Sequence, residues 1–207
     1  MDMLRITPKR PTPRTRLTCL TGAILVVAAS LAQAASADRD RDRDGFRAKV
    51  AGTCTNKDDF SFTGAATGFY PGGAFRIHCV LTGDSSLGRL DAQILAELRI
   101  TGDGCSVPGA SGLLATVTGY VLVFSLADTQ EQLFLTLKDG SECLTPPGTA
   151  GPGTVQLTVT GGTGRFGRAG GTVVNKLAPI ALAFSALGGD GFVSAFSGTF
   201  EGDVVLR

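Results

Sequence analysis

The 207-residue chain contains no tryptophan, two tyrosines and a single histidine, His78. It therefore lacks aromatic platforms for sugar rings. Glu201 and Asp203 would stand side by side on one strand face, whereas the two carboxyl groups of a glycosidase face each other across a cleft, so a glycosidase is not expected. His78 is the one imidazole that could act as a base, and no Gly-x-Ser-x-Gly elbow accompanies it. Alternation along a strand sends His78 and Cys79 to opposite faces. We assign no catalytic residue and favour a protein that is not an enzyme.

The sequence also lacks a Cys-x-x-Cys pair and a Gly-Lys-Ser/Thr phosphate loop. With one histidine, no metal-ligand set is complete, so neither a metal nor another cofactor is expected. No apolar run reaches the roughly 20 residues that a membrane-spanning helix needs. The formal net charge is +1 at pH 7, and nothing in the composition attracts nucleic acid.

Residues 1–37 have the order of a secretory signal peptide. A basic start precedes the apolar run LTGAILVVAASLA, and small-residue cleavage signals end at Ala34 and Ala37. Cleavage there predicts a secreted or periplasmic protein with no integral membrane span, and an uncleaved membrane anchor is the alternative. The leader holds five basic residues and one acidic residue, so the remainder carries 14 Lys and Arg against 17 Asp and Glu.

Four cysteines remain after this cleavage: Cys54, Cys79, Cys105 and Cys143. In an exported chain they indicate two disulfide bonds, for which three pairings exist. Cys105 lies in TGDGCSVPGA and Cys143 in DGSECLTPPG, two loops of matching Gly/Pro-rich composition. We therefore pair these two, and Cys54 with Cys79 follows by elimination.

The rest of the chain predicts a charged linker and one domain. Residues 38–45, DRDRDRDG, alternate in sign and indicate a solvated, flexible linker, and residues 46–207 form the domain. In residues 89–100, RLDAQILAELRI, apolar side chains occupy every second position, which favours a strand over a helix. Further strands are expected at 60–68, 74–83, 120–126, 133–137, 154–160, 180–186 and 192–206.

About eight to ten strands and no convincing helix indicate an all-β fold. Glycine supplies 29 of the 207 residues, about twice its usual share. Glycines within strands permit the bulges and coiling of a closed sheet, and closure removes exposed strand edges. We predict an antiparallel barrel of about eight strands, with a β-sandwich as the alternative.

A glycine-rich run at residues 161–171 has the spacing Gly162-x-Gly164-x-x-Gly167 of a dinucleotide-binding loop. That mechanism needs a helix to follow, yet Gly170, Gly171 and a β-branched run come next. We predict instead a hairpin in which Phe166 folds back over the core. Its motif consists of Gly161, Gly162, Thr163, Gly164, Arg165, Phe166 and Gly167.

The stretch TGGTGRFGRAGGTVV resembles the Gly-Gly-Thr-Gly-x-Phe hairpin of the dirigent and allene oxide cyclase families. It is more similar still to exported bacterial proteins with Gly-Gly-Thr-Gly-Arg-Phe. The specific match covers about a dozen residues, and the strand order and the closing FSGTFEGDVVL agree more loosely. The resemblance implies an antiparallel barrel of eight strands, often oligomeric, so a homo-oligomer is expected.

The sequence and this resemblance leave two candidate functions. The first is a non-enzymatic barrel that binds a small apolar ligand or a protein partner. The second is a dirigent- or cyclase-like barrel that steers the cyclisation or coupling of a reactive apolar intermediate. A lumen lined by phenylalanine that also holds several buried polar groups would favour the second, and a plugged lumen would favour the first without a small ligand.

Overall fold

The computed structural model describes residues 45–207 apart from 58, 69, 108–109, 146–148, 151–152, 179 and 185–191. The signal peptide predicted for residues 1–37 and its cleavage near Ala34 or Ala37 lie outside the described residues. Nearly all of the linker predicted at 38–45 lies outside them as well, and strand β1 begins at Gly45.

The described residues form an all-β fold, as predicted. The strands are β1 (Gly45–Asn56), β2 (Ala74–Ser85), β3 (Gly88–Val107), β4 (Ala110–Leu126), β5 (Gln132–Thr145), β6 (Thr149–Ala150), β7 (Gly153–Gly162), β8 (Gly170–Leu177), β9 (Ile180–Phe184) and β10 (Phe192–Val205). The one helical element in this part of the chain is a 3-10 turn, η1 (Gly164–Phe166). The described residues include no helix with the length and apolar character of a membrane span.

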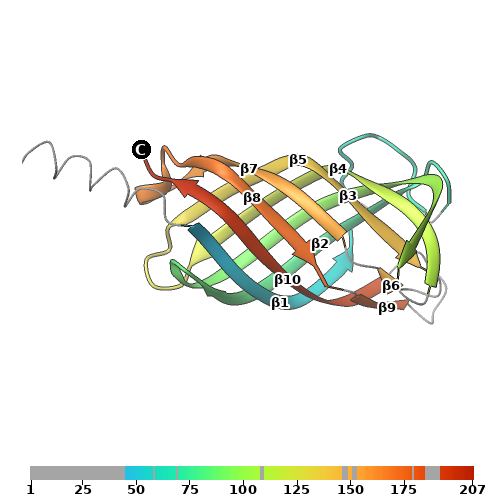
Figure 1. Ribbon diagram of the computed structural model, residues 1–207, viewed down its shortest axis with the longest axis horizontal. Helices are drawn as coiled ribbons and strands as arrows, with labels where there is room; N and C mark the ends of the chain where they lie inside the picture. Colours follow the sequence, from blue (N-terminus) through green and yellow to red (C-terminus); the bar gives the residue numbers. More distant parts are fainter. Residues whose placement is uncertain are drawn as a thin grey trace, which may run out of the picture. The chain divides into compact units, whose positions relative to one another are not determined.

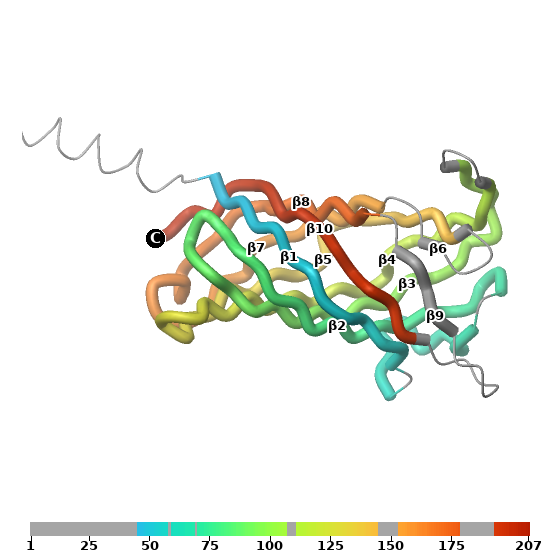
Figure 2. The backbone as a smooth tube through the Cα atoms, turned by 90° about the horizontal axis from the view of Figure 1, so that it is seen from below, coloured from blue at the N-terminus to red at the C-terminus, as the bar shows by residue number. Residues whose placement is uncertain are grey.

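Eight strands pair antiparallel in a closed ring, in the order β1, β2, β3, β4, β5, β7, β8, β10 and back to β1. Figure 1 shows β1 and β10 side by side, and Figure 2 shows the same two strands side by side from below. The short strands β6 and β9 pair with each other, between β5 and β10, beyond the paired parts of β7 and β8. All pairings belong to one sheet, whereas a sandwich needs two.

Along the eight strands of the ring, residues at alternate positions point inward between the bulges. On β7, Val155, Leu157 and Val159 are buried while the residues between them are exposed. On β3 the apolar residues from Leu90 to Ile100 are buried at every second position, so the strand predicted there is confirmed. The interior of the ring is therefore the hydrophobic core. Full burial of one such side chain contributes about 1.5–3 kcal/mol to stability.

The strand predicted at residues 60–68 is wrong, because these residues form an irregular loop between β1 and β2. Gly64 has a φ of +71°, in the left-handed region that glycine favours. The backbone N–H groups of Phe62 and Thr63 donate to the carboxylate of Glu97 on β3. A side chain thus takes the hydrogen bonds that a neighbouring strand would have supplied.

Two disulfide bonds join Cys54 to Cys79 and Cys105 to Cys143. These are the pairs that the sequence favoured. Cys54 and Cys79 lie directly opposite each other on β1 and β2 and are buried. Cys105 and Cys143 lie on β3 and β5, not in loops as expected, and their bond links two strands that do not pair with each other, with the two Cα atoms 5.8 Å apart. With sequence separations of 25 and 38 residues, each bond contributes about 3–4 kcal/mol through chain entropy.

Residues 163–169 connect the antiparallel strands β7 and β8, and the predicted motif at 161–167 covers the end of β7 and most of this turn. Gly161 has a φ of +120°, and Phe166 is buried in the core. The N–H of Thr163 donates to the carbonyl of Gln132 at 2.8 Å, and its hydroxyl accepts from the N–H of Gln132 at 2.8 Å. These two hydrogen bonds fasten the hairpin to β5. A dinucleotide site needs a helix after the glycine-rich turn, and here the strand β8 follows it.

Candidate functional site

Phenylalanine side chains fill the end of the ring that carries the β7–β8 hairpin. The ring centroids of Phe46 and Phe124 lie 5.4 Å apart, and those of Phe124 and Phe200 lie 5.1 Å apart. Phe166 of the hairpin is buried in the same core. Offset and edge-to-face packing at these distances is favourable, and it makes this end a packed core.

Polar side chains lie farther along the interior of the ring, which we call the lumen. They are Tyr120 on β4, Glu142 on β5, Asn175 on β8 and Ser194 on β10, with exposures of 5%, 6%, 0% and 4%. Buried polar groups lower stability unless they are hydrogen-bonded. Four of them inside one ring therefore require an explanation.

A β-bulge aims Tyr120 into the lumen. On β4, Val117 pairs with Leu98 and Gly119 with Glu97, so Thr118 is an extra residue in the register. Inward positions are odd before the bulge and even after it, since Val117, Tyr120 and the later even-numbered residues are buried. Bulges re-aim side chains in this way next to functional sites.

A second bulge aims Glu142 inward on the adjacent strand. Leu137 of β5 pairs with Leu157 of β7, and Asp139 pairs with Gln156, so Lys138 is unpaired. After this bulge the inward positions are even, and Glu142 is buried. Without the shift in β5, Glu142 would point to the outer face.

The hydrogen bonds in the lumen leave acceptors unused. Asn175 Nδ2 donates to the hydroxyl oxygen of Tyr120 at 3.0 Å, and Asn175 Oδ1 has no partner among the described residues. None of the described residues donates a hydrogen bond to the carboxyl of Glu142. Burial raises the pKa of Glu142 to about 8 and also raises the pKa of Tyr120.

A cavity of about 20 Å³ lies against Glu142 and Tyr120. Its other lining residues are apolar or disulfide-bonded: Ile77, Cys79, Ile94, Ala96, Leu98, Val117, Val155, Leu177 and Phe196. Ile77 and Leu177 are partly exposed, so the cavity reaches close to the surface there. A space of this size admits about one water-sized group. We call this cavity, with Tyr120, Glu142 and Asn175, the lumen site.

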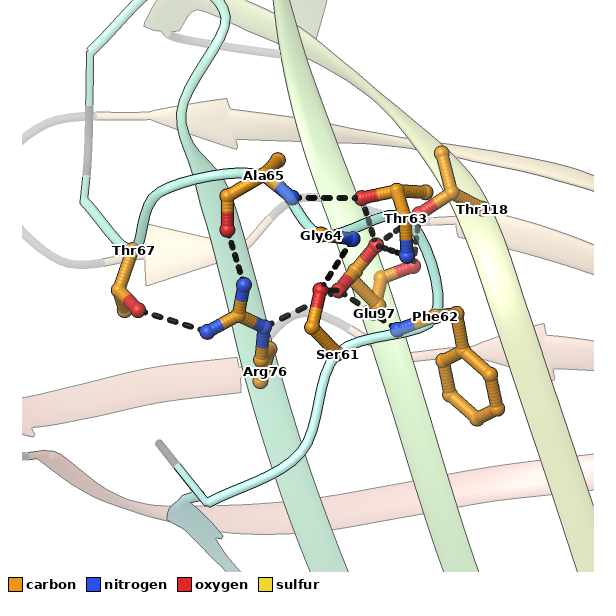
Figure 3. A network of polar contacts seen from close by, with 9 residues as sticks. All are labelled: Ser61, Phe62, Thr63, Gly64, Ala65, Thr67, Arg76, Glu97 and Thr118. Atoms are coloured by element: carbon orange, nitrogen blue, oxygen red, sulfur yellow. Dashed lines mark hydrogen bonds and ion pairs between the residues drawn. The ribbon is translucent and has the colours of Figure 1, made fainter.

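A second polar cluster lies on the outer face of the sheet, under the β1–β2 loop (Figure 3). We call Ser61, Thr63, Arg76, Glu97 and Thr118 the outer clamp. Arg76 Nε donates to Glu97 Oε2 at 3.0 Å, and both side chains are buried. The hydroxyl groups of Ser61, Thr63 and Thr118 also donate to this carboxylate. Figure 3 shows the ring of Phe62 pointing away from these contacts.

The outer clamp is a saturated structural site. Burial raises the pKa of Glu97, but the hydrogen bonds from Thr63, Ser61, Arg76 and Thr118 outweigh that effect and lower the pKa to about 2. Glu97 is therefore an anion whose acceptors are occupied. This cluster fixes the loop on the sheet and leaves no group for a ligand, in contrast to Glu142.

The residues singled out from the sequence do not form one site. Cys79 lines the cavity, His78 lies on the outer face, and Glu201 pairs with Lys176 on the surface at 3.0 Å. The sequence analysis missed Tyr120, Glu142 and Asn175. KDGSE, residues 138–142, is an available signal, because a glycine inside a strand often marks a bulge.

No protein-family model matches the chain, and no curated protein or solved structure is significantly similar to it. The chemistry of the lumen site follows from its residues. An apolar enclosure with a protonated carboxyl, a phenol and an amide can bind one polar group and surround it with apolar surface.

Proposed function

We propose that this protein is a secreted, non-enzymatic module that binds a small, mostly apolar ligand in the lumen. The closed ring is then a barrel of the dirigent and allene oxide cyclase type, with the Gly-Gly-Thr-Gly-Arg-Phe hairpin as its architectural signature. The two disulfide bonds support an oxidising compartment outside the cytoplasm. The order of residues 1–37 supports export through a signal peptide.

The carboxyl of Glu142, which has neither a hydrogen bond nor a counter-charge from the described residues, carries this proposal. A buried carboxyl without a hydrogen-bond donor or a counter-charge destabilises the fold, whereas leucine at position 142 would pack at no such cost. Locally unfavourable residues of this kind are expected at functional sites. Glu142 lines a cavity with Tyr120, which is the combination of perturbed pKa and apolar enclosure expected of a binding site.

The cavity accommodates the polar group of a ligand, and the apolar body needs additional space. Leu177 and Ile77 are the partly exposed lining residues, and rotation of their side chains would open the cavity toward the surface. Rotamer changes at binding sites are common and need little backbone movement. The ligand would enter on this side, opposite the packed phenylalanines.

Tyr120 provides the readout for a test. The chain has no tryptophan and two tyrosines, so a Tyr70→Phe variant makes Tyr120 the single tyrosine. Titration with small apolar compounds should change the tyrosine emission, and Ala96→Val, which adds two methyl groups to the cavity wall, should abolish the change. Ala195→Val on the exposed face of β10 is the matched control.

Native mass spectrometry of protein isolated from its own secreted fraction adds an independent test. A small molecule retained at one per chain supports the proposal, and the same spectra give the subunit number of the expected homo-oligomer. If the spectra contain only polypeptide and no compound alters the Tyr120 emission, the binding function is wrong.

A dirigent- or cyclase-like activity is the second candidate, and the buried polar groups in the lumen favour it. Burial keeps Glu142 protonated at neutral pH, so it could donate a proton, with Tyr120 and Asn175 close by. Turnover of an apolar electrophile that depends on Glu142 would distinguish this function from binding alone.

A further inference from the structure

The lumen contains one ionisable carboxyl and no basic side chain among the described residues. Arg76 is the one buried basic residue in this part of the chain, and it lies in the outer clamp, paired with Glu97 at 3.0 Å. The residues opposite Glu142 come from six other strands, and all but Tyr120 are apolar or disulfide-bonded. The described residues thus supply an anion-forming group in the lumen without a counter-ion.

Two hydrogen-bond acceptors in the lumen have no described donor, although the hydroxyl groups of Tyr120 and Ser194 can donate as well as accept. The hydroxyl oxygen of Tyr120 accepts from Asn175 Nδ2 at 3.0 Å. Asn175 Oδ1 is fully buried and has no described partner. The carboxyl of Glu142, 6% exposed, receives no hydrogen bond from the described residues. A ligand that donates hydrogen bonds would satisfy Asn175 Oδ1 and Glu142, and a positive charge would match the ionised carboxylate best.

We propose that the lumen site binds a small primary amine, with its ammonium group against Glu142 and its apolar tail against Leu177 and Phe196. This inference rests on the proposed binding function and specifies its ligand class. An ammonium has three N–H donors, and the cavity of about 20 Å³ matches a head group about the size of a water molecule. A carboxylate ligand is disfavoured, because no cation in the described lumen balances its negative charge.

Ammonium binding has a defined dependence on pH. The pKa of Glu142 is about 8 because of burial, so the carboxyl is mostly protonated at neutral pH and must release its proton when an ammonium binds. Affinity should rise as the pH increases to about 8 and fall near pH 10, where alkyl amines lose their own proton. Tyr120 on β4 is the other titratable group at the cavity, and its pKa is raised by burial, so it stays neutral in this range.

The test compares butylamine, 1-butanol and butyrate on the Tyr70→Phe protein at about pH 8. Butylamine should bind at least about tenfold more tightly than butanol, the ratio expected for a charge-assisted hydrogen bond, and butyrate should not bind. Calorimetry in two buffers of different ionisation enthalpy should detect proton release that decreases as the pH rises above 8. Glu142→Gln should reduce butylamine binding to the level of butanol, and Asp203→Asn on the outer face should not.

The outcomes separate the amine assignment from the proposed ligand-binding function. If butanol and butylamine bind equally, or if Glu142→Gln leaves amine binding intact, the amine assignment is wrong and the binding function stands. If no compound binds and none is retained in native spectra, both are wrong. If Glu142→Gln does not fold, proton release by the parent protein still decides the question, since a neutral ligand would release none.

Discussion

Replacing Glu142 with glutamine should change how the stability of the protein depends on pH. Glu142 is 6% exposed and lacks a described hydrogen-bond partner, and burial raises its pKa from 4.5 to about 8. The folded protein therefore holds this proton in a range of pH where the unfolded chain has lost it. Because the unfolded state binds fewer protons, stability must decrease as the pH rises from about 4.5 to 8.

The size of the effect follows from the pKa difference. One pKa unit corresponds to about 1.4 kcal/mol, so a change from 4.5 to about 8 lowers the free energy of unfolding by about 3–5 kcal/mol across this range. Glutamine does not titrate and removes this slope. Near pH 4.5 the variant should be no more stable than the parent, because it buries an amide in place of a neutral carboxyl. Near pH 8.5 it should be the more stable of the two.

Urea unfolding followed by far-UV circular dichroism, at half-unit intervals from about pH 4.5 to pH 8.5, measures this difference. Asp203→Asn, an exposed carboxylate on the outer face of β10, controls for the change in net charge. The slopes against urea should remain equal, so that midpoint shifts report stability. Parallel stability profiles of the parent and the Glu142→Gln variant would refute the assignment of a protonated carboxyl in the lumen.

Two further predictions concern the outer face. Glu97→Gln should lower the free energy of unfolding by about 3–5 kcal/mol at pH 7, because it leaves Arg76 buried without its counter-charge, and proteolysis should then cut within residues 60–68. The sign is opposite to that of Glu142: the Glu97 contribution is complete above about pH 4.5 and is lost as the pH falls toward the pKa of about 2. Gly119→Ala should lower stability by about 1–3 kcal/mol, because its Cβ would lie 2.1 Å from Cδ2 of Phe62. In a Phe62→Ala background the same substitution should have little effect in urea unfolding, and an unchanged loss there would contradict the contact.

Alternation made the strands predictable, because a buried ring interior and an outer face impose a period of two. This held for β3 and for β10. On β10, Phe196, Phe200 and Val204 are buried, and small residues take the inward positions between them. It failed at residues 60–68, since the pattern FSFTGAATG reports local β-propensity only. Their hydrogen-bond acceptor, Glu97, lies more than 30 residues away in sequence, so tertiary contact decided the conformation.

The lumen site was hidden from the sequence for a related reason. Tyr120 and Glu142 reach the interior through one-residue shifts in register at Thr118 and Lys138, and strict alternation cannot anticipate such shifts. With uninterrupted alternation from Val117, Tyr120 would point outward and Val121 inward. In the structure Val121 is 36% exposed and Tyr120 is 5% exposed.

The bulge on β4 links the two polar clusters. Thr118 is the extra residue that turns Tyr120 inward, and its hydroxyl donates to Glu97 Oε1 at 2.9 Å in the outer clamp. Glu97 is held in turn by Arg76 and by the loop over residues 61–63. The loop on the outside of the sheet therefore stabilises the register on which the lumen site depends. Loss of the clamp should reach the interior through this bulge, as a change in the burial of Tyr120 rather than as a change at Glu142, whose own bulge lies on β5.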